Sequence, residues 1–421
     1  KYTGTIQYRF INKSEINPKV PYAKKNFKDK LNNHFLNFPF SRFSSNKIFT
    51  QSLYFSKELR FKFDLLYRQF GYEEKNIDLD FSSQVDFDKR DIFLKLINGK
   101  DSFVKFAYGL VKYHLPKIFF EDYKEKIKSI NKSKLPEKPK IVATAVEHNY
   151  DDPFKLYIAQ KVLKGSKFYI FQHGASYGIS KFNSAEKYEA RFSDKLFTWG
   201  WKNSKKTSPL FVQQVANKKI VKKRNASGLI IPVNEFYLQP TPNFLHGNPR
   251  IKMEVNKYID NIILFLSKID KNVLNTSNFK YVDRINSKYV LKSLKFKFPN
   301  IKFIKSTKNT YALSNRFKLT VETINSTGFL ESLNLNIPVI LILDRKYCPI
   351  RKSALKHFEM LKKVKIIHSN PTEAADFVNK RYSKLEEWWN GKSLQKARNE
   401  FCYKFARQSG NPLKDLKKVL N

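Results

Sequence analysis

Three polar segments of the 421-residue chain carry side chains that could do chemistry. The first is Glu147-His-Asn-Tyr-Asp-Asp152. Paired carboxylates beside a histidine suit a general base, a nucleophile or a stabiliser of an oxocarbenium ion. We therefore predict catalytic roles for Glu147, Asp151 and Asp152, with helix capping by one of the aspartates as the alternative. The spacing matches no metal-ligand signature, so we predict no metal site.

The second segment, Gln172-His-Gly-Ala-Ser-Tyr-Gly178, places a histidine beside glycines that allow close backbone approach. His173 could act as a general acid or base, or as a cation toward phosphate or carboxylate. The alternative is a loop histidine whose hydrogen bonds are satisfied within the protein. We predict a catalytic role for His173, and the predicted donor-binding residues beside it are Gln172, Gly174 and Tyr177.

The third segment, Asn325-Ser-Thr-Gly-Phe-Leu-Glu331, has the composition of a turn that opens a helix. Backbone N–H groups at a helix N-terminus attract phosphate, so we predict that Ser326, Thr327 and Gly328 hold the phosphate of a nucleotide. Glu331 would then accept the ribose hydroxyls. The alternative is ordinary capping by Ser326, with Glu331 on the helix surface. The chain contains neither a P-loop nor a Gly-x-Gly-x-x-Gly motif, which argues against an NAD enzyme.

Each of the three segments follows a predicted strand. Ile141–Ala145 precedes the first, Lys167–Phe171 runs into the second, and Phe317–Val321 precedes the third. A helix is predicted from Pro153 to Leu163, and Lys195–Trp199 is predicted as a further strand. Alternating strands and helices indicate a parallel sheet with crossover helices. Ligands bind beyond the carboxyl ends of such strands, which is where all three segments lie.

The alternation repeats after residue 225, so we predict two lobes. Further strands are expected at Ile301–Ile304, Ile337–Leu343 and Val364–Ile367, and helices at Asn256–Lys268, Thr327–Leu335, Thr372–Arg381 and Leu385–Ala406. Helical spacing before the Pro- and Lys-rich linker 131–140 predicts a helical N-terminal region, with the stripe of Phe103, Phe106, Leu110 and Tyr113 in its core.

The predicted fold class is therefore α/β, with two Rossmann-like lobes that face a cleft. The expected boundaries are 1–135 for a mostly helical region packed on the first lobe, 136–225 for the first lobe, 226–385 for the second lobe and 386–421 for C-terminal helices. The first lobe is expected on the acceptor side and the second on the nucleotide side.

The net charge is +43, from 80 Lys and Arg against 37 Asp and Glu. An apolar fraction of 41% with 15% aromatic residues excludes a disordered chain. The charge indicates either a polyanion partner or biased codon usage. Lys is spread along the whole chain together with abundant Asn, Ile, Phe and Tyr, whereas nucleic-acid binders concentrate charge and favour Arg. We therefore predict no nucleic-acid partner and keep a non-catalytic polyanion-binding protein as the least favoured alternative.

Several motifs together resemble a family of bacterial surface-carbohydrate transferases. The matching stretches are Asp151–Lys155, Phe171–Gly178, Ser193–Trp201, Ser326–Glu331, Asn336–Pro338 and Glu387–Trp389. The resemblance covers most of residues 110–415. That family is similar to capsule and Kdo-type glycosyltransferases and, more distantly, to teichoic-acid glycerophosphotransferases. One departure is Gly174-Ala175, where the family tends to have two glycines, and we expect the small alanine to preserve the loop.

The resemblance implies the glycosyltransferase B (GT-B) arrangement, with a nucleotide-sugar donor held mainly by the second lobe and an acceptor glycan by the first. It implies no required cofactor and no catalytic metal, because helix dipoles and basic side chains neutralise the leaving phosphate. Asp151 or Asp152 would be the base or nucleophile, and His173 would assist as acid or base.

We predict a glycosyltransferase that moves a sugar from a nucleotide-activated donor to a surface polysaccharide or a lipid-linked glycan. A CMP-linked acidic sugar is one option for the donor. The alternative on the same fold is a polyol-phosphate transferase that uses a CDP-alcohol. No apolar run approaches the ~18 residues of a membrane span. We expect a cytoplasmic protein with peripheral contact to the inner face of the membrane.

Overall fold

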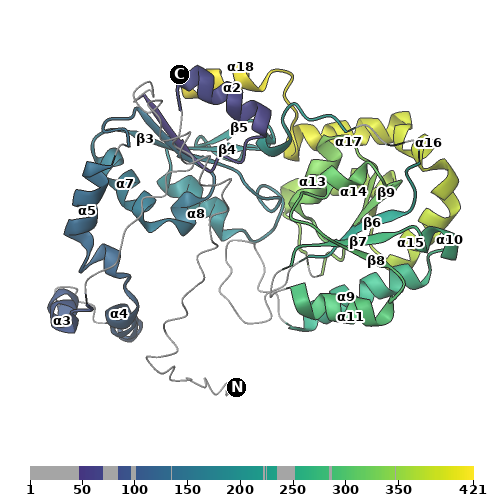
Figure 1. Cartoon of the computed structure of the whole chain (residues 1–421), viewed down its shortest axis with the longest axis horizontal. Helices are drawn as coiled ribbons and strands as arrows, with labels where there is room; N and C mark the ends of the chain where they lie inside the picture. The colour runs from purple at the N-terminus through teal and green to yellow at the C-terminus, as the bar shows by residue number, and fades with distance from the viewer. Residues whose placement is uncertain are drawn as a thin grey trace, which may run out of the picture.

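The computed structural model describes residues 47–69, 84–95, 101–133, 135–220, 223, 225–234, 252–283, 287–346 and 348–421. These residues form two lobes that stand side by side, each built on a fully parallel sheet (Figure 1). The predicted α/β class with two such lobes is confirmed by this topology.

The first sheet has five strands in the order β1-β2-β3-β4-β5. They are β1 (Ile48–Gln51), β2 (Ile141–Thr144), β3 (Lys167–Phe171), β4 (Lys195–Thr198) and β5 (Thr207–Pro209). β2, β3 and β4 were predicted, but β1 and β5 were not. β1 lies in the region expected to be helical and pairs with β2 along its whole length. All four of its residues are buried, so the strand shows no alternation from which it could be recognised.

Helices and short turns connect and flank the strands of this sheet. They are α5 (Tyr123–Lys132), α6 (Glu147–Tyr150), α7 (Asp152–Leu163) and α8 (Ser184–Phe192), with the short turns η2 (Lys117–Phe119) and η3 (Gln213–Val215). α7 begins where the side chain of Asp151 accepts a hydrogen bond from Phe154 N. It ends before Gly165, whose φ of +92° suits glycine. The helix predicted between β2 and β3 is thereby confirmed at both ends.

The N-terminal helices are α2 (Lys57–Tyr67), α3 (Phe87–Lys95) and α4 (Ser102–His114). Leu59 and Phe63 of α2 are fully buried. The prediction for α4 was wrong, because Phe103, Phe106 and Tyr113 are 72%, 60% and 66% exposed among the described residues. α3 and α4 lie at the lower left of Figure 1, away from the first sheet.

The second sheet has six strands in the order β11-β10-β9-β6-β7-β8. They are β6 (Leu229–Pro232), β7 (Asn278–Tyr281), β8 (Lys302–Lys305), β9 (Leu319–Glu322), β10 (Val339–Ile342) and β11 (Ile367–His368). Both faces are covered. Val339 and Leu341 join the core beside α13 and α14, whereas Ile340 and Ile342 join the core beside α9 and α11. Burial on both faces explains the continuous apolar run that predicted β10.

The helices of this lobe are α9 (Lys252–Ser267), α10 (Lys271–Leu274), α11 (Lys288–Lys297), α12 (Tyr311–Ser314), α13 (Thr327–Asn334), α14 (Lys352–Lys363) and α15 (Pro371–Arg381). The chain then forms η6 (Tyr382–Lys384), α16 (Leu385–Asn390), α17 (Lys392–Phe405) and α18 (Pro412–Leu420). The single helix predicted from Leu385 to Ala406 is wrong, since Gly391 adopts extended backbone angles and divides it. α17 packs on α13 and α14, and α18 packs on α2 of the first lobe.

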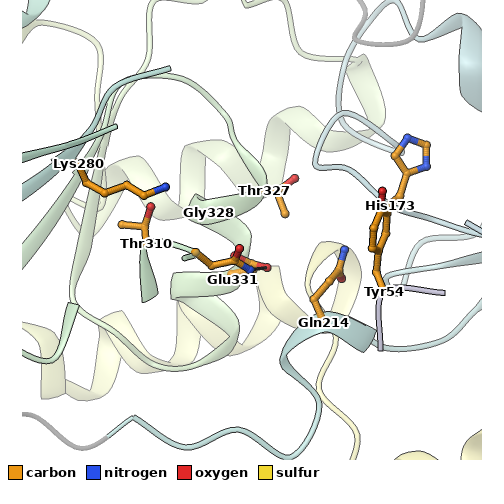
Figure 2. Close-up of a pocket in the computed structure, with 9 residues that line it drawn as sticks. Tyr54, His173, Gln214, Lys280, Thr310, Thr327, Gly328 and Glu331 are labelled. Atoms are coloured by element: carbon orange, nitrogen blue, oxygen red, sulfur yellow. Dashed lines mark hydrogen bonds between the residues drawn. The ribbon is translucent and has the colours of Figure 1, made fainter. Parts of the chain in front are cut away.

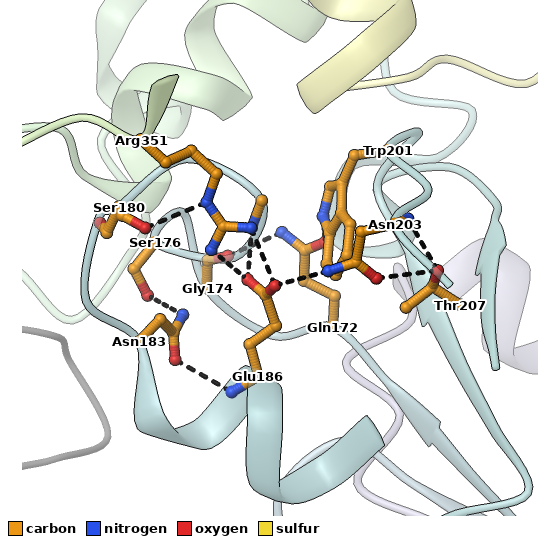
Figure 3. A network of polar contacts seen from close by, with 11 residues as sticks. Gln172, Gly174, Ser176, Ser180, Asn183, Glu186, Trp201, Asn203, Thr207 and Arg351 are labelled. Atoms are coloured by element: carbon orange, nitrogen blue, oxygen red, sulfur yellow. Dashed lines mark hydrogen bonds and ion pairs between the residues drawn. The ribbon is translucent and has the colours of Figure 1, made fainter. Parts of the chain in front are cut away.

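A partly buried ion pair joins the two lobes (Figure 3). Arg351, at the start of α14, binds Glu186 of α8 through two hydrogen bonds of 2.9 and 2.7 Å. Glu186 also accepts a hydrogen bond from Gly178 N at 2.8 Å, and Ser180 pairs with Ile350 as an antiparallel bridge. The loop that follows β3 is therefore held from both lobes. In the described part of the chain, no helix is long and apolar enough to span a membrane.

Candidate active site

The loop after β3 is shaped by a buried glutamine (Figure 3). Gln172 is fully buried, and its Oε1 accepts hydrogen bonds from Trp199 N at 2.9 Å and Trp201 Nε1 at 2.8 Å. Its Nε2 donates to the carbonyl oxygen of Gly174 at 2.8 Å. Gln172, predicted to bind the donor, thus presents no surface to a ligand and acts as a scaffold for the loop.

His173 is the next residue, and it is half-buried at the wall of a cavity. Its Nδ1 lies 3.3 Å from Tyr177 Oη. The hydroxyl of Tyr177 donates to Glu189 Oε1 at 2.9 Å, and the same oxygen lies 3.0 Å from His148 Nε2. Tyr177, also predicted to bind the donor, is 1% exposed and bound to protein partners. Of the second segment, His173 is the residue that reaches the cavity.

The same loop has the sequence Gly-Ala-Ser-Tyr-Gly over residues 174–178. This matches the Gly-x-Ser-x-Gly pattern of a hydrolase nucleophile elbow. Such a serine needs a base beside its hydroxyl. Here the hydroxyl of Ser176 instead accepts a hydrogen bond from Asn183 Nδ2 at 3.0 Å (Figure 3). Ser176 does not line the cavity, so the motif serves the loop structure.

The acidic segment lies after β2 and is engaged in local contacts. Asp151 caps α7, because its Oδ1 accepts a hydrogen bond from Phe154 N at 2.9 Å. This is the helix-capping role that we gave as the alternative to catalysis. Burial raises the pKa of Asp151, and the nearby carboxylates of Glu147 and Asp152 raise it further against that hydrogen bond. Asp152 binds Lys155 Nζ at 2.7 Å, and Glu147 accepts a hydrogen bond from Ser52 Oγ. None of the three carboxylates lines the cavity.

The third segment forms the N-terminus of α13. Ser326 caps the helix, because its Oγ accepts a hydrogen bond from Phe329 N at 3.1 Å and donates to Glu322 Oε2 at 2.9 Å. Gly328 is required by the space available, since a Cβ there would lie 2.8 Å from Glu322 Oε1. Ser326 is therefore occupied by capping, and Thr327 and Gly328 are left to face the cavity.

The cavity lies between the lobes and has a volume of about 370 Å³ (Figure 2). His173, Tyr54 and Gln214 stand on one side, and the α13 residues stand on the other. The lining residues are Tyr54, His173, Gln214, Lys280, Asn309, Thr310, Thr327, Gly328 and Glu331.

On the side of the second lobe, Glu331 and Lys280 line the cavity, and the buried carboxyl group of Glu322 lies next to Gly328. Glu331 is 3% exposed, and burial raises its pKa to about 8 against the attraction of Lys218 and Lys280 and a hydrogen bond from Asn309. Burial likewise raises the pKa of Glu322 to about 7 against the hydrogen bond from Ser326. A neutral Glu331 near Lys280 leaves this wall positive, which suits an anion at the N-terminus of α13.

The structure therefore brings four predicted residues to one cavity, namely His173, Thr327, Gly328 and Glu331. Glu331 is buried, so its alternative placement on the helix surface is wrong. Sequence reasoning missed Tyr54 and Lys280, which belong with β1 and β7. Neither strand was predicted, so no strand end drew attention to these side chains. The described residues contain no group of three or more His, Cys, Asp or Glu that could hold a metal ion.

A family model supplies the clearest comparison with known proteins. The model for the LIC12162 family transferase matches residues 3–420. No curated protein matches the sequence.

The solved structures to which the chain is similar at low identity include TarM, MnaA and HepE. S. aureus TarM, a variant in complex with fondaparinux, α-GlcNAc-glycerol and UDP, shares 16% identity over 67% of this chain and 54% of its own, with a TM-score of 0.38. S. aureus MnaA with UDP shares 12% over 89% and 95%, with a TM-score of 0.44. Anabaena HepE with UDP-glucose shares 8% over 70% and 80%, with a TM-score of 0.42. The chain spans about half the length of TarM.

Proposed function

Because the chain belongs to the LIC12162 family transferases, we propose that it moves a sugar from a nucleotide-activated donor to a surface polysaccharide or a lipid-linked glycan. The predicted transferase class is confirmed by the family; the sugar and the acceptor are our proposal. One observation carries it: a cavity between the lobes has His173 on one side and the N-terminus of α13 on the other. An acid–base group opposite an anion site suits transfer from a phosphorylated donor.

The second lobe would hold the nucleotide. Thr327 and Gly328, the first two residues of α13, line the cavity, and the backbone N–H groups and positive dipole end of a helix N-terminus attract phosphate. Lys280 adds a positive charge on the same wall. Glu331, hydrogen-bonded by Asn309 Nδ2 at 3.2 Å, would accept the ribose hydroxyls. These groups stabilise the negative charge that the leaving nucleotide gains in the transition state.

His173 is proposed as the general base. The acceptor hydroxyl would attack the anomeric carbon, so that its C–O bond forms while the bond from that carbon to the donor phosphate breaks. The hydroxyl proton passes to His173, and the electron pair leaves with the nucleotide. Asp151 and Asp152 stay candidates for a supporting role, but their contacts are with α7. His173 is the predicted catalytic residue that lines the cavity.

The proposal is tested first by nucleotide binding. Calorimetric titration with CMP, CDP, UDP and GDP should show one nucleotide with a Kd below about 1 mM, the usual range for a substrate site. Sugar derivatives of the nucleotide that binds are then tested as substrates, and release of the free nucleotide identifies the donor. A CDP-alcohol that transfers its polyol phosphate would instead support the alternative reaction. Absence of binding for all four nucleotides with folded protein would contradict the proposal.

The second test separates chemistry from binding. His173→Ala should leave the nucleotide Kd within about threefold and lower turnover by at least about 100-fold, because general base catalysis contributes that much. His357→Ala removes a histidine of α14 that is also half-buried but does not line this cavity, and it is the matched control, with unchanged turnover expected. Full activity of His173→Ala would remove the base from this mechanism.

We also propose that the protein contacts the inner face of the cytoplasmic membrane, where lipid-linked acceptors are presented. The support comes from α4. Its residues Phe103, Phe106 and Tyr113 are exposed, and the helix contains no acidic residue. Lys105 is an exposed cation of this helix, whereas Lys112 is paired with Asp91 of α3. Exposed aromatic side chains beside an exposed lysine suit a bilayer surface with anionic lipids.

A further inference from the structure

A chain of hydrogen bonds runs from the cavity into the interior of the first lobe. It begins at His173 Nδ1, passes through Tyr177 Oη at 3.3 Å, and reaches Glu189 Oε1 a further 2.9 Å away. His148 Nε2 lies 3.0 Å from the same carboxylate oxygen. Tyr177 and Glu189 are 1% and 0% exposed. Residues of α6, of the loop after β3 and of α8 thus form one hydrogen-bonded chain that ends at the imidazole of His173.

The chemistry of these side chains determines which atom donates in each hydrogen bond. An ionised carboxylate only accepts hydrogen bonds, so the single proton of the Tyr177 hydroxyl points to Glu189. The oxygen of Tyr177 then faces His173 as an acceptor. A neutral imidazole must meet it with Nδ1–H, which leaves the lone pair on Nε2.

The burial of these groups supports that direction. Burial and the neighbouring Glu189 raise the pKa of Tyr177 well above its usual value, so the hydroxyl keeps its proton. Burial raises the pKa of Glu189 against its hydrogen bonds with His148 and Tyr177, so the direction of the chain rests on the geometry, in which Tyr177 Oη donates to Glu189 Oε1. A carboxyl group without exposed surface is costly to bury, and a purely packing role would be served by an apolar side chain.

We propose that Tyr177 and Glu189 are positioning residues that hold His173 in the Nδ1–H tautomer and present Nε2 for proton transfer. The proposal rests on the proposed function for the use of Nε2 as a base. The tautomer itself is a property of the resting protein. It can be measured without any substrate, so its failure and the failure of the proposed function can be told apart.

The direct test is the tautomer of His173 in the complete chain. Two-bond ¹H–¹⁵N spectra of histidine-labelled protein, at a pH where imidazoles are neutral, distinguish Nδ1–H from Nε2–H rings. The chain has seven histidines, and the signals of His173 are those absent from His173→Gln. We expect the Nδ1–H pattern in the unmodified protein. An Nε2–H pattern would overturn the proposal without any need for a variant.

A variant with a matched control then tests the role of Tyr177. Tyr177→Phe should convert His173 to a mixture of tautomers. Tyr157→Phe is the control, because Tyr157 is also 1% exposed and its hydroxyl donates to the carbonyl oxygen of Pro136 at 2.8 Å in the same lobe. It should leave the tautomer unchanged. An unchanged tautomer in Tyr177→Phe would overturn the proposal.

Glu189 has its own pair of variants. Glu189→Gln should give a smaller shift in the same direction, because a neutral amide oxygen holds the Tyr177 hydroxyl less firmly than a carboxylate does. Glu121→Gln alters another carboxyl group of the first lobe, whose side chain is 5% exposed and binds Arg90, and should leave the tautomer unchanged. An effect of Tyr177→Phe without any effect of Glu189→Gln would refute the part assigned to Glu189.

Kinetics connect the tautomer to turnover. Tyr177→Phe should lower kcat by at least about tenfold and leave KM within about twofold, since the base is disturbed and the donor site is not. A loss confined to KM would contradict a positioning role. If no transfer is found with any donor while the spectra show the Nδ1–H ring, the proposed function fails and the positioning of His173 stands.

Discussion

Replacing Glu331 with glutamine should make the folded protein less sensitive to alkaline pH. The side chain is 3% exposed, and burial raises its pKa from the ordinary value of 4.5 to about 8. Glutamine has the same shape and can still accept the hydrogen bond that Asn309 Nδ2 donates at 3.2 Å. The substitution therefore removes the titration and preserves the contact.

The magnitude follows from proton linkage. Between pH 4.5 and about 8 the folded state retains a proton on Glu331 that the unfolded state has lost. Stability therefore falls as pH rises through this window. One pKa unit corresponds to about 1.4 kcal/mol, so the full span is about 5 kcal/mol. Because Glu331 lines a cavity open to solvent, we expect the free energy of unfolding to change by about half of that span, about 2–3 kcal/mol.

Urea denaturation at pH 5, 7 and 9 measures the effect. The free energy of unfolding of Glu331→Gln minus that of the unmodified protein should be near zero at pH 5, where both side chains are neutral. It should rise by about 2–3 kcal/mol at pH 9. Glu359→Gln is the control, because Glu359 is exposed and pairs with Arg345. A difference for Glu331→Gln that does not change with pH would refute the reasoning.

Three further perturbations follow from the contacts. Gly328→Ala forces a Cβ to within 2.8 Å of Glu322 Oε1, at a strain of about 1–3 kcal/mol, and calorimetry should show at least about tenfold weaker nucleotide binding. Arg351→Ala leaves the buried Glu186 without its cation and should cost about 2–3 kcal/mol in urea denaturation. Phe103→Ser combined with Phe106→Ser should at least halve sedimentation of the protein with anionic vesicles.

Each of these perturbations has a matched control. Gly109→Ala places its Cβ in open space and should leave nucleotide binding unchanged. Arg345→Ala breaks an exposed pair and should cost less than about 1 kcal/mol. Phe296→Ser removes a phenylalanine that is 88% exposed in the second lobe and should leave vesicle binding unchanged. Equal effects of a variant and its control would contradict the corresponding reasoning.

Much of the second lobe and part of the first could be predicted because their signals are local. The apolar run at β10 and the cap, proline and glycine around α7 lie within a few residues of one another. The rule that ligands meet the carboxyl ends of parallel strands then pointed to His173 and to the start of α13. β1 and β7 escaped this reasoning. β1 lies in the region whose spacing predicted helices, and β7 has the polar residues Asn278 and Lys280 among its four, so it contains no continuous apolar run.

The sequence by itself determined the class of fold, the family and the short segments in which the candidate residues lie. Only the tertiary structure decided which of those residues share a cavity and which are scaffold. His173 and Gln172 are neighbours in the chain, yet one reaches the cavity and the other is fully buried. Lys280 and Glu331 line the same cavity because β7 and β9, which is followed by α13, both end at the carboxyl edge of the second sheet. The physical reason is that burial and partnership depend on contacts between distant segments, which local spacing does not contain.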